Sequence, residues 1–152
     1  MPELPPALSS LLAALASMDR AERMDTLMDL AEQFREPPPG VADRPFPESH
    51  RVPGCESEAY LWAEPRGDHT LKFHFAVENP QAVSAKATAV ILDRVLSGLL
   101  LEEVAWIPTD VIYEIFGREL SMGKNLGLSN MLAMCQACAR EASKPDYPWP
   151  VR

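Results

Sequence analysis

Positive charge is scarce in this sequence. Lys and Arg together number 14 against 22 Asp and Glu, so the net charge at pH 7 is −8. Proteins that bind nucleic acids or anionic lipids through phosphate groups carry a basic surface, which this composition does not provide. We therefore expect neither nucleic acid nor a membrane among the partners of the protein.

Long hydrophobic runs and a cysteine framework are absent as well. The longest apolar run, at residues 95–101, is interrupted by Ser97 and Gly98, and a helix that crosses a bilayer needs about 20 apolar residues. The first six residues, MPELPP, contain no basic residue that would open a secretory signal. The three cysteines, with two of them three residues apart, do not suggest paired disulfides. We expect a soluble, cytoplasmic protein with reduced thiols.

What the sequence does contain is enough apolar residues to fill a core. It has 152 residues, of which 47% are hydrophobic and 24% charged, a balance typical of one folded domain of ~100–150 residues. Prolines at positions 145, 148 and 150 interrupt the last residues. We predict one domain over residues 1–144 and an irregular, proline-rich tail over residues 145–152.

Helical patterns fill the first 36 residues. Leucines at positions 8, 11, 12 and 15 recur at helical spacing, and Asp19 and Glu22 form a capping box that begins a second helix. Three consecutive prolines at positions 37–39 end that helix. The proline-rich residues 37–53 then predict an extended strap laid over the surface.

A β-hairpin is predicted in the middle of the chain. Residues 57–64 and 70–77 have the aromatic and alternating apolar patterns of strands, and residues 65–68 (PRGD) are typical of a turn. A short strand over residues 49–52 precedes them. Further helices are predicted over residues 79–97, 100–105, 110–116 and 129–142. We predict an α+β fold, with a small antiparallel sheet of about three strands packed against helices.

Cys55 is the main candidate for chemistry. It follows Pro53 and Gly54 in a tight turn between the strap and the first long strand. Because Pro53 fixes its φ angle and Gly54 permits unusual backbone conformations, the turn can present Cys55 at a sharp tip. A thiol on a loop can be reached by a reaction partner. The alternative is a half-buried cysteine that only fills space beside the sheet.

Cys135 and Cys138 have the spacing of a redox or zinc motif. They fall late in the last predicted helix, where the helix dipole disfavours a thiolate. A structural zinc site needs four ligands, and the sequence has no second such pair. The two cysteines fit better on an inward helix face with neighbouring apolar residues, namely Leu128, Met131 and Leu132.

Lys124 is a weaker candidate. It lies in residues 122–125 (MGKN), which we interpret as a glycine-rich loop before the last helix. A cation there would stabilise a nearby thiolate, and an ordinary surface lysine is the alternative. The sequence has neither a nucleotide-binding glycine motif nor a serine-hydrolase nucleophile motif.

The residues around Cys55 resemble those of the SufE family of sulfur-acceptor proteins. Gly54-Cys55-Glu56-Ser57 followed by Tyr60-Leu61 is similar to the family's Gly-Cys-Gln-Ser and its following Trp-Leu. The likeness extends from about residue 11 to residue 142. It includes the start of the second helix, the proline-rich approach to the cysteine, and Gly127-Leu128 near the last helix.

The resemblance implies a SufE/NifU-like fold and a function in iron–sulfur cluster assembly. Cys55 would accept persulfide sulfur from a pyridoxal-phosphate cysteine desulfurase of the SufS or CsdA type and enhance its activity. The sulfur would then pass to an iron–sulfur scaffold complex of the SufBCD type. Pyridoxal phosphate belongs to the partner, so the chain needs no cofactor of its own and would act as an activator rather than a stand-alone enzyme.

The chain departs from the family pattern at several positions. Around the cysteine and the last helix, Glu56 replaces Gln, Tyr60 replaces Trp, and Gly123-Lys124 replaces Ser-Arg. In the helix after the sheet, Pro80 stands in place of Asp and Lys86 in place of Gly. These changes leave Cys55 in place and bear on partner docking.

Two other functions stay open from the residues alone. A thiol redox protein would use Cys135 and Cys138 and would form a reversible disulfide. A non-catalytic interaction domain would use its acidic surface and would not need Cys55. A direct iron–sulfur scaffold role is disfavoured, because clusters require several thiolates.

Overall fold

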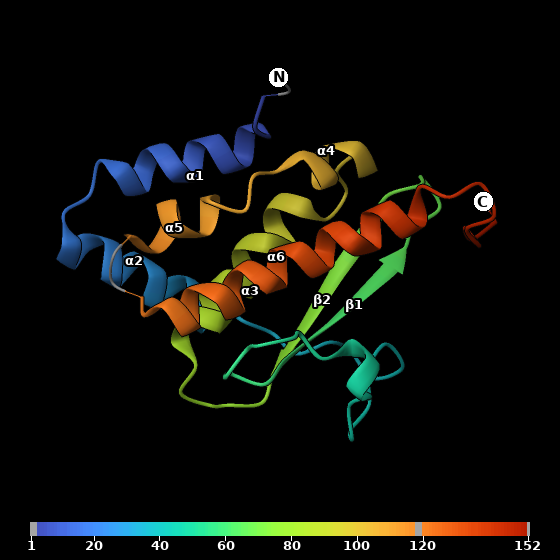
Figure 1. Ribbon diagram of the computed structural model, residues 1–152, viewed down its shortest axis with the longest axis horizontal. Coiled ribbons are helices and arrows are strands. Elements are labelled where there is room, and N and C mark those ends of the chain that lie inside the picture. Colours follow the sequence, from blue (N-terminus) through green and yellow to red (C-terminus); the bar gives the residue numbers. More distant parts are fainter. Residues whose placement is uncertain (1–2, 118–119, 152) are drawn as a thin grey trace.

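The computed structural model describes residues 3–117 and 120–151 and has an α+β architecture (Figure 1). Within these residues the elements are α1 (Pro6–Ala16), α2 (Arg20–Glu32), the 3-10 helix η1 (Glu48–His50), β1 (Ala59–Pro65), β2 (Leu71–Val77), α3 (Val83–Leu96), α4 (Leu101–Trp106), α5 (Val111–Phe116) and α6 (Met122–Ala142). The predicted fold class is therefore confirmed. Among the described helices, none combines the length and apolar composition required to cross a membrane.

The sheet is an antiparallel hairpin of β1 and β2, with Leu61 opposite Phe75. The predicted third strand over residues 49–52 is wrong, because this segment forms η1 and then a single bridge between Arg51 and Tyr60. Prolines at positions 47 and 53 flank the segment and lack the N–H groups that a longer ladder would need.

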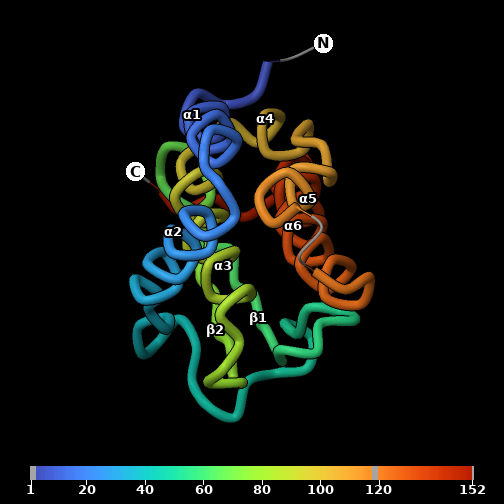
Figure 2. The backbone as a smooth tube through the Cα atoms, turned by 90° about the vertical axis from the view of Figure 1, so that its left-hand side faces the viewer, coloured from blue at the N-terminus to red at the C-terminus, as the bar shows by residue number. Residues whose placement is uncertain are grey.

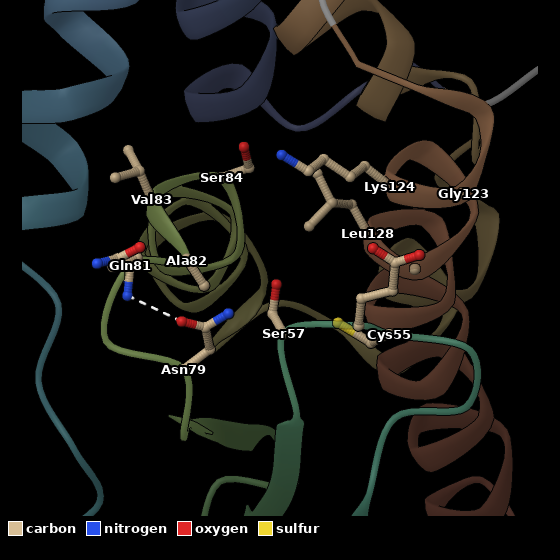
Figure 3. Close-up of a pocket in the computed structure, with 12 residues that line it drawn as sticks. Cys55, Ser57, Asn79, Gln81, Ala82, Val83, Ser84, Gly123, Lys124 and Leu128 are labelled. Carbon is tan, nitrogen blue, oxygen red and sulfur yellow. Dashed lines mark hydrogen bonds between the residues drawn. The ribbon is translucent and has the colours of Figure 1, made fainter.

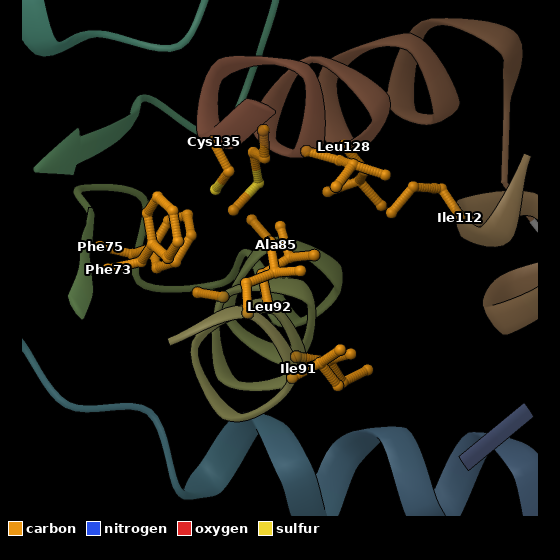
Figure 4. Close-up of a cluster of buried hydrophobic side chains, with 14 of the residues drawn as sticks. Phe73, Phe75, Ala85, Ile91, Leu92, Ile112, Leu128 and Cys135 are labelled. Carbon is orange, nitrogen blue, oxygen red and sulfur yellow. The ribbon is translucent and has the colours of Figure 1, made fainter. Parts of the chain in front are cut away.

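One face of the hairpin forms the hydrophobic core with α3 and α6. Phe73 and Phe75 alternate along β2 as predicted and are at most 3% exposed, and Leu61 of β1 is 1% exposed. They pack against buried side chains of α3 and α6, including Leu92 and Cys135 (Figure 4). α3 lies between α2 and α6 (Figure 2), so it is covered on both sides.

The strap covers the opposite face of the hairpin. Tyr60 and Trp62 point to this side, and Phe46 of the strap packs against both rings at centroid distances of 5.2 Å. Arg44 forms ion pairs with Glu36 and Glu78. These contacts confirm the predicted strap and fix the chain that leads to Cys55.

Capping residues set the helix boundaries. The Asp19 carboxylate accepts a hydrogen bond from the Glu22 N–H at 2.9 Å, which confirms the predicted start of α2. α6 begins at Met122 rather than at the predicted residue 129, because the Ser121 hydroxyl caps the Lys124 N–H at 3.2 Å. Lys124 therefore lies in the first turn of α6, and its predicted position in a loop is wrong.

Candidate functional site

Cys55 lies in a short loop whose ends are fastened by backbone hydrogen bonds. The Val52 N–H donates to the Ala59 carbonyl at 2.8 Å at the base of the loop. Inside it, the Glu58 N–H donates to the Cys55 carbonyl at 3.2 Å. Gly54 has a φ of 66°, in the left-handed region that glycine tolerates best. The sequence correctly placed Cys55 in a tight turn.

The Cys55 side chain is buried rather than exposed to solvent. The residue is 7% exposed, so the expectation of an open loop tip is wrong for this conformation. The shielding comes from α6, which lies directly against the loop. A Cβ atom added to Gly127 would lie 3.0 Å from the Cys55 Cα. Only the missing side chain of Gly127 allows the helix to approach so closely.

A cavity of about 200 Å³ opens beside the Cys55 thiol (Figure 3). Its walls come from the loop, from the start of α3 and from the first turns of α6. Polar groups of Ser57, Asn79 and Ser84 face it together with the apolar side chain of Leu128. A second, shallow hollow is lined by Glu48, Arg51 and residues 52–56, which include Cys55. The thiol is thus covered but lies beside a cavity.

Lys124 lines the same cavity as Cys55. Figure 3 shows its side chain extending toward Ser84 and away from the Cys55 sulfur. The structure therefore brings the two predicted site residues to one cavity without a direct contact. A thiolate-stabilising role for Lys124 stays a prediction.

Cys135 and Cys138 lie in the second half of α6. Cys135 is 0% exposed and faces the aromatic core residues (Figure 4). Burial raises the pKa of the Cys135 thiol well above its usual range and also raises the pKa of Cys138. A redox pair needs an accessible thiolate of low pKa, so this environment argues against the redox alternative.

The three thiols are free and should differ in reactivity. In the folded protein near pH 8 we expect iodoacetamide to modify Cys55 and Cys138, and to modify Cys135 only after unfolding. The raised pKa values of Cys135 and Cys138 reduce their thiolate fractions, and burial blocks access to Cys135. Peptide mass mapping over time measures the order, and modification of Cys135 ahead of Cys55 would contradict it.

Comparisons with known proteins identify the family and agree with the fold. Residues 9–139 match the SufE family, described as the Fe-S metabolism associated domain. The chain belongs to the SufE family. The solution structure of a hypothetical protein from Thermus thermophilus is similar to this SufE-family chain, with 28% identity and a TM-score of 0.74. The match covers 92% of this chain and 98% of that chain. No match was found among curated proteins.

Of the two departures from the SufE pattern in this region, Lys86 lies in α3 and Pro80 lies in the turn before it rather than in the helix, and α3 is continuous from Val83 to Leu96. The Lys86 ammonium folds back and donates to the Pro80 carbonyl at 3.1 Å. It also lies 6.0 Å from the centre of the Phe34 ring. Lys86 thus packs against its own chain in this SufE-family protein, near but outside the cavity lining.

Two polar residues of α6 were missed by the sequence analysis. The Asn130 side-chain amide donates to the Pro53 carbonyl at 2.7 Å, next to Cys55. The Gln136 amide is buried and donates to carbonyls at the end of α4. Their partners lie 77 and about 30 residues away in the SufE-family chain, so no local pattern marks them.

Proposed function

We propose that the protein accepts sulfur on Cys55 from the persulfide of a pyridoxal-phosphate cysteine desulfurase and passes it to iron–sulfur cluster assembly. The main support is the position of Cys55, a free thiol beside a cavity lined in part by polar groups. Membership of a family associated with Fe-S metabolism gives independent support. We also propose a cytoplasmic location, which keeps the thiols reduced.

The transfer is a thiol exchange without net oxidation or reduction. The Cys55 thiolate attacks the terminal sulfur of the desulfurase persulfide, and a new S–S bond forms on Cys55. The old S–S bond breaks, and the desulfurase cysteine leaves as a thiolate. The acceptor then carries the persulfide, while the desulfurase is ready for another molecule of cysteine.

The closed conformation suits a carrier of persulfide sulfur. A persulfide exposed to solvent can lose its sulfur to other thiols or be oxidised. At 7% exposure, Cys55 is shielded from both reactions. The cavity of about 200 Å³ leaves space for one additional sulfur atom beside Ser57 and Ser84.

Exposed apolar side chains near the cavity offer a docking surface for the desulfurase. Val83 lines the cavity and is 41% exposed, and it also lines a neighbouring hollow with Met24 and Met28, which are 43% and 49% exposed. A protein partner must contact this region to bring its persulfide to Cys55. Burial of these side chains on docking would contribute to binding.

Alanine production by the desulfurase tests the proposal. With L-cysteine as substrate, we expect the alanine formation rate to rise when the chain is added, because removal of persulfide sulfur frees the desulfurase cysteine. The measurement uses the desulfurases encoded in the same genome. An unchanged rate with each of them, and no sulfur bound to the chain, would contradict the proposal.

A further inference from the structure

α6 carries a row of three residues that seats the Cys55 loop. Gly123, Gly127 and Asn130 share one helix face at spacings of four and three residues. Each meets a loop residue in reverse order along the chain: Gly123 lies near the Glu56 carboxylate, Gly127 against Cys55, and Asn130 against Pro53. These three residues, which we call the seat, therefore contact the loop along residues 53–56.

The contacts on this seat differ in kind. Asn130 donates one hydrogen bond to the Pro53 carbonyl at 2.7 Å. At Gly127 the contact is steric, because an added Cβ would lie 3.0 Å from the Cys55 Cα and 3.1 Å from the Gly54 carbonyl oxygen. Both distances are to backbone atoms, which cannot move aside without moving the loop.

The rest of the loop is tied to the sheet and not to α6. The Ser57 and Glu58 carbonyls accept hydrogen bonds from the N–H groups of Asn79 and Glu78, at 3.3 Å and 3.1 Å. The segment that can lift from α6 with these bonds intact is therefore residues 53–56. This segment contains Gly54, whose backbone is the most adaptable in the loop.

We propose that Asn130 is a positioning residue. Together with the missing side chain of Gly127, it sets the population of the open conformation in which the Cys55 thiol is exposed. The thiol must leave the seat to reach a partner's persulfide and must return to be shielded. The Asn130–Pro53 hydrogen bond favours the closed position, and the space at Gly127 makes that position possible. This inference rests on the proposed function, and its test does not require a desulfurase.

The test is the iodoacetamide reaction rate of Cys55, with Cys138 as an internal control in the same molecule. In Asn130→Ala we expect the Cys55 rate to rise about two- to tenfold, the factor expected from loss of one hydrogen bond to a neutral carbonyl. Asn130→Asp, which has the same shape, should also raise the Cys55 rate, because its carboxylate cannot donate a hydrogen bond to Pro53. The Cys138 rate should not change in either variant.

Gly127→Ala and Gly123→Ala form a matched pair in the same helix. Gly127→Ala should raise the Cys55 rate more than tenfold, because the new Cβ displaces the loop, even though alanine is the better helix former. Gly123→Ala should raise the rate much less than Gly127→Ala, since its Cβ would lie 3.5 Å from the mobile end of Glu56, an ordinary contact.

Unchanged Cys55 rates in both Asn130 variants would overturn the proposal. So would equal increases at Cys55 and Cys138, which would indicate a general loosening of the fold. If the rates change as expected but Cys55 accepts no sulfur, the positioning role of Asn130 stands and the proposed function fails. If Cys55 accepts sulfur but the iodoacetamide rates are the same in the variants and the wild type, the proposed function stands and the positioning role of Asn130 fails.

Discussion

We expect the Cys55→Ser variant to accept no sulfur from a desulfurase and to give no stimulation of alanine formation. A serine hydroxyl is not ionised at neutral pH and does not attack a persulfide, so the loss should be complete rather than partial. The fold should persist, because serine is close to cysteine in size and its hydroxyl faces a cavity with polar walls. The stability cost should be about 1 kcal/mol.

Labelled sulfur from cysteine measures the loss, and Cys138→Ser is the matched control. Cys138 is also a free thiol but lies near the C-terminal end of α6, so its replacement should leave acceptance at the wild-type level. Full acceptance by Cys55→Ser would contradict the proposal and show that another thiol takes the sulfur. Full stimulation of alanine formation by Cys55→Ser, with no sulfur bound, would support the interaction-domain alternative. Loss of acceptance in Cys138→Ser would support the redox alternative instead.

The Gln136→Glu variant should be strongly destabilised. Gln136 is 6% exposed. Its side-chain amide donates hydrogen bonds to the carbonyls of Val104 at 3.2 Å and Ile107 at 2.6 Å. A glutamate of the same shape would place a carboxylate against these carbonyl oxygens in a buried site. We expect a loss of about 3 kcal/mol or more at pH 8, because an unpaired buried charge is costly.

The pH dependence of the Gln136→Glu defect should have a definite sign. Burial favours the neutral carboxyl, so the pKa of the new glutamate in the folded state should exceed its unfolded value of about 4.3. The variant then loses stability relative to the wild type as the pH rises toward the folded pKa. Part of this loss should be recovered when the pH is lowered from 8 to 6. Urea unfolding at the two pH values measures the difference.

Gln136→Met is the control for this prediction. It leaves the α4 carbonyls without their donor but adds no charge, so we expect a smaller cost of about 1–3 kcal/mol without pH dependence. Equal stability of the Met and Glu variants at pH 8 would show that the Gln136 amide does not hold α6 against α4 in the way described.

Much of the fold could be predicted because local patterns determine it. The alternation of Leu71, Phe73 and Phe75 marks the buried face of β2, and all three are buried. Asp19 could be predicted as a helix cap because its partner, the Glu22 N–H, is only three residues away. Cys55 was placed correctly in its turn because Pro53 and Gly54 act on the backbone locally.

The environment of Cys55 could not be predicted because it depends on distant residues. The thiol is covered by α6, and the nearest helix contact is with Gly127, 72 positions further along the chain. Residues 122–125 were interpreted as a glycine-rich loop, whereas they begin α6, and Gly127 lets this helix pack closely against the Cys55 loop. Sequence periodicity does not report which elements meet, so the shielding of Cys55 and the role of Asn130 required the structure.

Peptide mass mapping after incubation with a desulfurase and L-cysteine tests the central claim most directly. We predict one additional sulfur atom on the peptide that contains Cys55 and none on the peptide that contains Cys135 and Cys138. Added sulfur on the Cys135–Cys138 peptide, or on neither peptide while the desulfurase itself carries a persulfide, would contradict the account.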